Sequence, residues 1–550
     1  MLTVNDLAVS FQTRRGEVNA VRGISFELEK SEILGIVGES GSGKSVTAYA
    51  LMRILDEGGV IKAGNLEYSG MDLRRAAERN MRDIRGREIS MIFQNPRAAL
   101  NPIRKVGHQI EDVLRQHLRA TRHDAREKAI AALKAVRIND AEARFDAYPF
   151  ELSGGMCQRI VCAIALACDP KLLIADEPTT GLDITTQKAV MDLVRDLIRE
   201  RSMSSILITH DLGLAAEYCD RIVVMKDGVI VEQGDPASLF SNPQHAYSRK
   251  LVDATPREGE SIRSLLPPED RMDLLPHTVH DRALLDVRDL VKTWQGKAGP
   301  VHAVKGISFS IKEGQSVGLV GESGCGKSTT SEILVRLTDA TSGEIVFDGH
   351  DIATISANKF IVDSRRADIQ MVFQDATDSL NPRHTARQTI EEPLRRLGGL
   401  RGVKLNTRIE ELATLVGLPH SLLDRFPHQL SGGQKARAGI ARAVALEPKF
   451  LVLDEPTAAL DVSIQAVVLN LLVDLRAQLG MTYLFVSHDL HVVRLLCDHV
   501  IVMKEGEIVE QGPTREVMFN PENDYTKTLL SAAPKPPARR EMKMESDVQS

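Results

Sequence analysis

Short apolar runs alternate with longer segments of helical spacing along the whole chain. An apolar run of four to six residues with polar flanks is typical of a strand buried on both faces, as in a parallel sheet covered by helices. We therefore expect two sets of buried strands, the first at 33–37, 172–175 and 205–209 and the second at 315–320, 450–453 and 482–487. Each set predicts one α/β domain.

Two other patterns add elements to the predicted domains. Residues 222–234 (IVVMKDGVIVEQG) and 500–512 (VIVMKEGEIVEQG) place Asp-Gly or Glu-Gly between apolar runs, which predicts a hairpin. Residues 109–136 carry apolar positions at helical spacing. We interpret this segment as a separate helical subdomain.

The chain contains the same blocks twice, in the same order. GESGSGKS at 38–45 returns as GESGCGKS at 321–328, so the two lysines are 327 − 44 = 283 positions apart. The other repeated blocks keep offsets of 278 to 280, and they are Gln94 and Gln374, LSGG at 152 and 430, Asp176-Glu177 and Asp454-Glu455, and His210 and His488. A period this long indicates two whole domains in tandem rather than a solenoid.

Composition places the domain boundaries. The proline-bearing stretch 255–284 predicts a linker over the surface, between a first domain at 1–254 and a second at 285–533. The polar tail 534–550, which begins PKPPARR, is expected to be disordered.

Charge and hydropathy narrow the function classes. The 550 residues carry a formal net charge of −6, so there is no basic excess to indicate a nucleic-acid partner. No run approaches the roughly 18 consecutive apolar residues of a membrane helix. The first residues lack a signal-peptide pattern, so we expect the chain in the cytosol. The six cysteines form no CxxC pair, and we expect reduced thiols without a zinc or iron–sulfur site.

The glycine-rich blocks predict nucleotide binding. In GxxxxGK[ST] after an apolar strand, glycine N–H groups surround phosphate oxygens, Lys44 or Lys327 adds a positive charge, and Ser45 or Ser328 ligates Mg²⁺. The plain alternative is a glycine-rich turn between strand and helix. Two copies, each followed by an apolar strand ending in Asp-Glu, favour the nucleotide interpretation, with Asp176 and Asp454 in the Mg²⁺ shell.

The order of phosphate loop, Gln, LSGG, Asp-Glu, a Leu-Asp turn and a late His resembles the nucleotide-binding domain of ATP-binding-cassette (ABC) proteins, over nearly all of both halves. The resemblance implies an α/β fold of two tandem cassettes, each with a RecA-like sheet core, an antiparallel β subdomain and a helical subdomain. It also implies head-to-tail pairing, with each ATP held between the phosphate loop of one half and the LSGG of the other.

The resemblance assigns the site residues, with ATP and Mg²⁺ as cofactors. Glu177 and Glu455 would polarise the attacking water, and His210 and His488 would contact the terminal phosphate. The Mg²⁺ ligands would be Ser45, Gln94 and Asp176 in one half and Ser328, Gln374 and Asp454 in the other. The ATP-binding residues would be Phe11, Gly38, Glu39, Ser40, Gly41, Ser42, Gly43, Lys44, Ser45, Gln94, Ser153, Gly154, Gly155 and Met156, and Trp294, Gly321, Glu322, Ser323, Gly324, Cys325, Gly326, Lys327, Ser328, Gln374, Ser431, Gly432, Gly433 and Gln434.

Both halves keep the Glu and the His, so we expect two hydrolytic sites. Site one would pair the first phosphate loop with Ser431–Gln434, and site two the second loop with Ser153–Met156. Met156 stands where the family pattern has Gln, and Lys435-Ala436-Arg437 also departs from that pattern. These changes affect contacts to the ribose and the start of the helix, not the reaction.

Two aromatic residues and two cysteines have more open interpretations. Phe11 and Trp294 each lie 33 positions before the loop lysine and would stack on adenine, or alternatively plug the β subdomain. Cys157 and Cys325 would both belong to site two, where thiol alkylation would inhibit and ATP would protect. Two inert small residues are an equally good interpretation of this pair.

Further signatures concern the partner. QNPRAALNP (94–102), QDATDSLNP (374–382), NPQHAYSRKLVDATP (242–256) and NPENDYTKTLLSAAP (520–534) resemble the dipeptide, oligopeptide and nickel branch of ABC importers, with fused members for peptides or glutathione. This implies two transmembrane permease subunits contacted beside Gln94 and Gln374, an extracytoplasmic solute-binding protein, and a location at the cytoplasmic face of the inner membrane.

Two alternatives stay open at this point. A soluble tandem-cassette ATPase acting on ribosomes or nucleic acid would also lack membrane spans, but the linker here is short and has no basic block. A stand-alone ATPase or small-molecule kinase would share the loop but would not explain LSGG.

Overall fold

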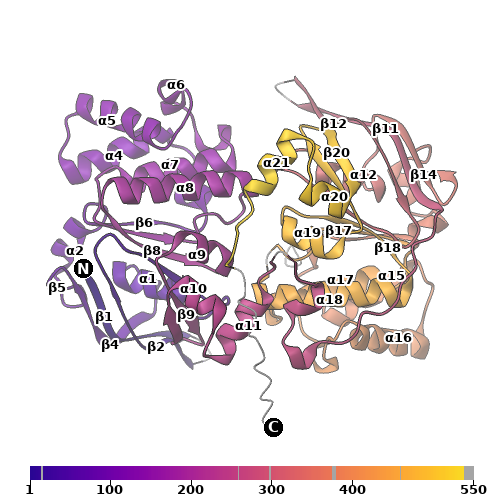
Figure 1. Ribbon diagram of the computed structural model, residues 1–550, viewed down its shortest axis with the longest axis horizontal. Helices are drawn as coiled ribbons and strands as arrows, with labels where there is room; N and C mark the ends of the chain where they lie inside the picture. The colour runs from indigo at the N-terminus through magenta and orange to yellow at the C-terminus, as the bar shows by residue number, and fades with distance from the viewer. Residues whose placement is uncertain (14–15, 258, 297–298, 375–378, 459, 538–550) are drawn as a thin grey trace, which may run out of the picture. The chain divides into compact units, whose positions relative to one another are not determined.

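The computed structural model describes residues 1–550 except 14–15, 258, 297–298, 375–378, 459 and 538–550. The chain divides into two compact units (Figure 1). Unit 1 comprises residues 1–182, 186–257 and the described part of 534–550, and unit 2 comprises 183–185 and 258–533. The expected disorder of the tail concerns mainly residues outside the described part of the chain.

Unit 1 contains two sheets. The antiparallel sheet has the order β2-β1-β4-β5, with β1 Leu2–Thr13, β2 Gly16–Leu28, β4 Gly59–Tyr68 and β5 Met71–Asp72. The second sheet has the order β10-β9-β3-β8-β7-β6, with β3 Ile33–Val37, β6 Ile89–Ile92, β7 Leu172–Asp176, β8 Ser204–Thr209, β9 Arg221–Lys226 and β10 Val229–Gly234. All neighbours in the second sheet are parallel except β9 and β10.

Helices lie between and beside these strands (Figure 1). In unit 1 they are α1 Lys44–Met52, α2 Glu78–Ile84, α3 Pro96–Ala99, α4 Val106–Leu118, α5 Arg122–Ala135, α6 Ala141–Phe145, α7 Gly154–Leu166, α8 Ile184–Glu200, α9 Leu212–Tyr218, α10 Pro236–Ser241 and α11 Ala246–Ala254, with a 3₁₀ turn η1 at Pro149–Glu151. The segment 109–136 is therefore two helices, which separate at Arg119 in the left-handed conformation and at the N-cap Thr121.

The phosphate-loop strand β3 divides unit 1 into two cores. Leu34 and Ile36 pack with the antiparallel sheet, whereas Ile33 and Val37 pack with the helices α4 to α8. Side chains alternate between the faces of a strand, so an apolar strand covered on both sides contributes to both cores. The helical subdomain is not a separate core, because its Ile110 lies in the same cluster as Leu207 of the sheet.

Unit 2 repeats this architecture. Its antiparallel sheet has the order β12-β11-β14-β15 (β11 Ala283–Gly296, β12 Gly299–Lys312, β14 Ser342–Phe347, β15 His350–Asp351). Its six-stranded sheet has the order β16-β17-β18-β13-β19-β20 (β13 Ser316–Val320, β16 Ile369–Val372, β17 Phe450–Asp454, β18 Thr482–Val486, β19 His499–Lys504, β20 Glu507–Pro513). The helices are α12 Lys327–Leu334, α13 Ala357–Phe360, α15 Ala386–Arg396, α16 Gly402–Leu415, α17 Gly432–Val444, α18 Val462–Leu479, α19 Leu490–Leu496, α20 Thr514–Phe519 and α21 Asp524–Ser531, with 3₁₀ turns η4 Ser364–Arg366, η5 His420–Leu422 and η6 Pro427–Gln429.

The predicted strands and hairpins are present in both units. The six apolar runs coincide with β3, β7, β8, β13, β17 and β18 to within one residue at either end. In the hairpins, Asp227 and Gly228 have φ of 49° and 80°, and Glu505 and Gly506 have 49° and 89°. Two successive positive φ values are those of a type I′ turn, which matches the twist of the strands.

Part of the predicted linker 255–284 is buried rather than spread over a surface. It contains the 3₁₀ turns η2 Ile262–Leu265 and η3 Pro268–Asp270, and Ile262 and Leu265 are almost fully buried. Arg263 donates to Asn470 Oδ1 (3.1 Å) and forms an ion pair with Asp474 on α18. Buried polar partners of this kind hold the segment onto the second cassette.

Within the described residues, α18 alone is long and apolar enough to meet a length and composition criterion for a membrane span. Its Val468, Leu469 and Leu472 are fully buried inside unit 2. Core helices of this length meet the same criterion, so the finding is weak evidence for a span.

Candidate nucleotide-binding sites

The phosphate loop of unit 1 connects the end of β3 to the start of α1. Gly38, Gly41 and Gly43 have φ of 155°, 80° and 98°. A Cβ at Gly38 would lie 2.2 Å from Met225 O, and one at Gly43 would lie 2.6 Å from Ala20 O. Only glycine fits these positions. The loop therefore brings backbone N–H groups and the positive end of α1 to one place, which suits a phosphate.

The loop lysine is buried and held by carbonyl groups. Lys44 is 6% exposed, and its Nζ donates to Gly38 O (2.7 Å) and Glu39 O (2.9 Å). Lys327 makes the equivalent bonds in unit 2, to Gly321 O (2.7 Å) and Glu322 O (2.8 Å). The charge is thus fixed at the loop before nucleotide arrives.

Each loop serine faces the aspartate that ends β7 or β17, a strand of the same sheet separated from the phosphate-loop strand by one other strand. Ser45 Oγ donates to Asp176 Oδ1 (3.0 Å), and Ser328 makes a side-chain hydrogen bond to Asp454. Burial raises the pKa of Asp176 and of Asp454 to about 6, although these serine hydrogen bonds act in the opposite direction.

The second oxygen of each aspartate has no hydrogen-bond partner among the described residues. Asp176 Oδ2 and Asp454 Oδ1 are buried and accept no hydrogen bond from the described residues. A buried, unpaired carboxylate oxygen beside a serine hydroxyl is a hard oxygen donor set of the kind Mg²⁺ prefers. The residues therefore fit the predicted metal, which Ser45 with Asp176 and Ser328 with Asp454 would hold.

The predicted catalytic glutamates are ionised and surrounded by donors. Glu177 Oε2 accepts from Gln94 Nε2 (2.7 Å) and Thr180 Oγ1 (3.0 Å), and its Oε1 lies 3.1 Å from His210 Nδ1. Burial alone would raise the pKa of Glu177, but the bonds from His210, Gln94 and Thr180 outweigh it and lower the pKa to about 2. Burial opposes protonation of His210, yet the contact with Glu177 raises its pKa.

Unit 2 repeats this cluster with one partner fewer among the groups described. Gln374 Nε2 donates to Glu455 Oε2 (2.8 Å), and His488 Nδ1 lies 3.3 Å from Glu455 Oε1. Burial raises the pKa of Glu455, but His488 and Gln374 lower it below its usual range. Ala458 stands where unit 1 has Thr180, so that hydroxyl donor is replaced by a methyl group. The two glutamates therefore have unequal surroundings.

Both glutamates have an unusual backbone. The φ of Glu177 is 46° and that of Glu455 is 45°, in the left-handed region that a residue with a side chain seldom adopts. Their N–H groups donate to the neighbouring strand, at Ile208 O (2.8 Å) and Val486 O (2.9 Å). Strain of this kind persists where the surrounding structure enforces it, and it is concentrated at functional sites.

The LSGG blocks form helix N-termini. Ser153 and Ser431 are the N-caps of α7 and α17, and their hydroxyls accept from Met156 N (3.3 Å) and Gln434 N (3.4 Å). Gln434 Oε1 also accepts from Ser431 N (2.9 Å), which completes a capping box. Met156 has no such oxygen, so the first block lacks this reciprocal bond while its helix still begins at the same place.

The second glycine of each block permits close helix packing. A Cβ at Gly155 would lie 2.4 Å from Thr186 Cγ2 on α8, and one at Gly433 would lie 2.5 Å from Ile464 Cγ2 on α18. The first glycines have room, because the nearest atoms to a Cβ at Gly154 and Gly432 are at 3.9 Å and 3.4 Å. Close helix packing therefore requires glycine at the second glycine position of LSGG but not at the first.

The aromatic and cysteine candidates differ in accessibility. Trp294 is 41% exposed, with Lys292 Nζ 4.1 Å from its ring centroid, and Phe11 is partly buried against the β subdomain. Cys157 and Cys325 are buried, and burial raises the pKa of both thiols. A buried thiol of raised pKa is a poor nucleophile, which argues against the alkylation hypothesis.

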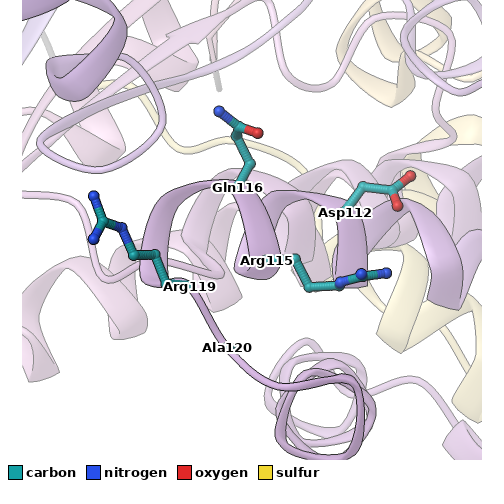
Figure 2. Close-up of a pocket in the computed structure, with 5 residues that line it drawn as sticks. All are labelled: Asp112, Arg115, Gln116, Arg119 and Ala120. Carbon is teal, nitrogen blue, oxygen red and sulfur yellow. The ribbon is translucent and has the colours of Figure 1, made fainter.

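One pocket of the structure lies away from these residues. It is on α4 and the loop that follows, lined by Asp112, Arg115, Gln116, Arg119 and Ala120 (Figure 2). None of the predicted site residues lines it, and its charged, open wall does not resemble a nucleotide site.

Sequence reasoning missed two groups that touch the site. Thr180 donates to Glu177, and Tyr247 accepts from the phosphate loop at Glu39 N (3.0 Å). Thr180 could not be found from the repeat, because the equivalent position in the second half is Ala458. Tyr247 could have been found from the repeat, because it recurs as Tyr525 at an offset of 278 residues, within the matching segments 242–256 and 520–534.

Each unit combines a phosphate loop, a strand-end aspartate beside the loop serine, and a glutamate paired with a histidine. This geometry defines a phosphate-loop nucleoside triphosphatase. The family model described as "ABC transporter" matches residues 21–180 and 304–458, and that of "Oligopeptide/dipeptide transporter, C-terminal region" matches 231–275 and 509–549. The chain belongs to the ABC transporter family: it is an ATPase of the oligopeptide/dipeptide branch and carries two ABC cassettes.

Relatives cover almost the whole chain. "Glutathione import ATP-binding protein GsiA" of Escherichia coli K12 is 43% identical over 97% of this chain and 89% of its own length. The protein of the same name in Salmonella choleraesuis is 42% identical over the same shares. A solved cassette, cbiO1 of Clostridium perfringens, is 33% identical over 44% of this chain and 93% of its own, with a TM-score of 0.39. The expected family, α/β fold and ATPase activity are thus confirmed, and membrane permease partners follow from the family.

Proposed function

We propose that the chain is the energy-coupling subunit of an importer for peptides or related small solutes, glutathione among them. The observation that carries this is the pair of complete hydrolytic clusters, each with a buried lysine, a serine–aspartate pair and a glutamate–histidine pair, in a chain with two oligopeptide/dipeptide-type C-terminal regions. The relatives named for glutathione import support this choice of solute. The ribosomal or nucleic-acid alternative is not favoured, because it does not account for those C-terminal regions.

Each residue has a distinct task in this reaction. The loop N–H groups and Lys44 would hold the phosphates, and Mg²⁺, bound by Ser45 and Asp176, would neutralise phosphate charge. Glu177 stays ionised at neutral pH and would orient and polarise the attacking water. His210, whose pKa is raised by Glu177, would donate a hydrogen bond to the terminal phosphate as charge develops. Gln94 would complete the metal shell. Lys327, Ser328, Asp454, Glu455, His488 and Gln374 would act in the same way in the second cassette.

The partners would be two permease subunits, supplied with solute by an extracytoplasmic binding protein, and the chain would lie at the cytoplasmic face of the membrane. Exposed apolar side chains flank the glutamines where permease contact is expected. Phe93 and Phe373 directly precede Gln94 and Gln374 and are 39% and 38% exposed, and Ile103 is 85% exposed. Exposed apolar groups of this kind are typical of partner surfaces.

Reconstitution tests this function. The full chain, assembled with its permease in proteoliposomes, should hydrolyse ATP faster when a binding protein loaded with glutathione or a dipeptide is added. Glu177→Gln with Glu455→Gln should bind ATP but lose at least 10²-fold in turnover. Full turnover in that double variant would remove both carboxylates from the mechanism, and stimulation by ribosomes instead of the binding protein would reject the importer.

We further propose that each ATP is shared head to tail between the cassettes. Lys44→Ala with Ser431→Arg would then damage a single site, whereas Lys44→Ala with Ser153→Arg would damage both. In a Glu177→Gln, Glu455→Gln background, the first combination should retain about one tightly bound nucleotide per chain and the second none. The reverse result would show that each LSGG serves its own phosphate loop.

A further inference from the structure

Each cassette carries a tyrosine that contacts its phosphate loop from the C-terminal region. Tyr247 is the second residue of α11 and Tyr525 the second residue of α21, in the segments NPQHAY and NPENDY. The Tyr247 hydroxyl accepts a hydrogen bond from Glu39 N (3.0 Å), and the Tyr525 hydroxyl accepts one from Glu322 N (3.1 Å). The same contact thus occurs in both cassettes.

The peptide unit in contact with the tyrosine is the one that holds the loop lysine. The N–H of Glu39 and the C=O of Gly38 belong to one planar peptide group. Tyr247 accepts from its N–H, while its C=O accepts from Lys44 Nζ at 2.7 Å. The tyrosine hydroxyl and the lysine ammonium therefore hold opposite ends of the same peptide.

Unit 2 repeats the arrangement. The peptide between Gly321 and Glu322 donates its N–H to Tyr525, and its C=O accepts from Lys327 Nζ at 2.7 Å. Gly321, like Gly38, has a positive φ, of 150°, so no side chain restricts the rotation of this peptide. A hydrogen bond from outside the loop is then an effective restraint on its orientation.

The tyrosine rings are themselves anchored to the sheet. Lys226 Nζ, at the end of β9, lies 5.1 Å from the Tyr247 ring centroid, and Lys504 Nζ, at the end of β19, lies 4.9 Å from that of Tyr525. β9 and β19 each pair with the strand that leads into the phosphate loop. The cation–π contact therefore fixes the ring relative to the loop.

Matching polar contacts fix the start of each helix. The side chain of His245 accepts from Tyr247 N (3.1 Å), and that of Asn523 accepts from Tyr525 N (2.8 Å). Glu232 on β10 accepts from His245 N (2.9 Å), and Glu510 on β20 accepts from Asn523 N (3.3 Å). An N-cap tied to a hairpin strand leaves the tyrosine little freedom.

We propose that Tyr247 and Tyr525 are positioning residues for ATP binding, by which each C-terminal helix sets the orientation of the Gly–Glu peptide and, through it, of the loop lysine. The C-terminal region thereby takes part in forming the nucleotide site of its own cassette. Preorganisation of this kind lowers the cost of ordering the loop when phosphate binds, so it acts on affinity more than on the chemical step.

The test is the full-length double variant Tyr247→Phe, Tyr525→Phe, which keeps both rings. The expected Kd and KM for Mg-ATP rise by roughly two- to tenfold, the range of one hydrogen bond, while kcat stays within about twofold of the parent. Hydrogen–deuterium exchange should accelerate at the Glu39 and Glu322 amides, which lose their acceptor. A Kd that is unchanged or tighter would overturn the proposal.

Two other tyrosines supply matched controls. The Tyr218 hydroxyl donates to Asp192 Oδ1 (3.0 Å), and the buried Tyr483 hydroxyl donates to Leu472 O (3.0 Å), both in contacts that do not involve a phosphate loop. Tyr218→Phe with Tyr483→Phe should lower thermal stability without changing the Kd for ATP. An equal loss of affinity in these controls would show a general structural effect. If the double variant does not fold, the same measurements are made on Tyr525→Phe alone. The Tyr525 ring is only half-buried, so this substitution disturbs the packing less.

Discussion

Neutralising the two strand-end aspartates should stabilise the nucleotide-free protein while abolishing Mg²⁺-dependent ATP hydrolysis. Asp176 and Asp454 are 1% and 5% exposed, and burial raises the pKa of both to about 6. Each has one buried oxygen that accepts no hydrogen bond from the part of the chain that the structure describes. A carboxylate with these properties is costly in the absence of a cation. Asparagine keeps the shape and removes the charge.

The magnitude follows from the shift. The pKa rises from 3.8 to about 6, and one unit corresponds to roughly 1.4 kcal/mol, so each ionised aspartate destabilises the folded state by about 3 kcal/mol at neutral pH. The folded pKa exceeds the unfolded one, so the cost is absent well below pH 4, grows as pH rises from about 4 to about 6, and is constant at higher pH. Asp176→Asn with Asp454→Asn should therefore raise the melting temperature by roughly 4–10 °C at pH 7.5 in EDTA.

Calorimetry at two pH values tests this reasoning. The gain in melting temperature at pH 7.5 should shrink to about a third, roughly 1–3 °C, at pH 4.5, and Mg²⁺ should stabilise the parent but not the variant. The neighbouring glutamates supply an opposite control. The pKa of Glu177 is lowered to about 2, so its charge stabilises the fold above pH 4.5, and Glu177→Gln with Glu455→Gln should lower the melting temperature. A destabilised Asp→Asn variant, or a gain independent of pH, would refute the account.

Three other predictions concern single positions. Gly433→Ala should destabilise the second cassette by about 1–3 kcal/mol, because its Cβ would lie 2.5 Å from Ile464. Gly432→Ala should lower the free energy of unfolding by less than about 1 kcal/mol, and chemical denaturation of both variants measures the two values. Met156→Gln should restore the capping box at α7 and add about 0.5–1 kcal/mol, and no gain in melting temperature would contradict this. Trp294 is the sole tryptophan, so its fluorescence should change on ATP binding if the ring stacks on adenine, and a flat titration at saturating nucleotide would count against stacking.

The strands and the phosphate loops could be predicted because their signals are local. A run such as ILGIV has no polar position, and the glycines of the loop have φ values or close approaches that exclude other residues. The repeat strengthened each prediction, since the second copy made chance matches implausible. The two-domain α/β architecture followed from the same observations.

Features that depend on distant contacts could not be predicted. The raised pKa of Asp176 arises from burial by surrounding elements. Glu177 and Glu455 differ in their hydrogen-bond donors, because Thr180 donates to Glu177 and its counterpart Ala458 has no hydroxyl. The buried part of the 255–284 segment escaped notice because its prolines and charges suggested exposure, while Arg263 in fact has partners more than 200 positions away.

The left-handed backbone at Glu177 and Glu455 has a consequence for mutational scanning. Any branched replacement at these positions would add about 1–2 kcal/mol of steric cost before its chemistry matters. Asparagine, aspartate and glycine tolerate this conformation better, and glutamine preserves the side-chain reach. Inactivity of a valine or isoleucine variant would therefore say little about the reaction. Only the asparagine, aspartate, glycine and glutamine variants separate the effect of backbone geometry from the function of the carboxylate.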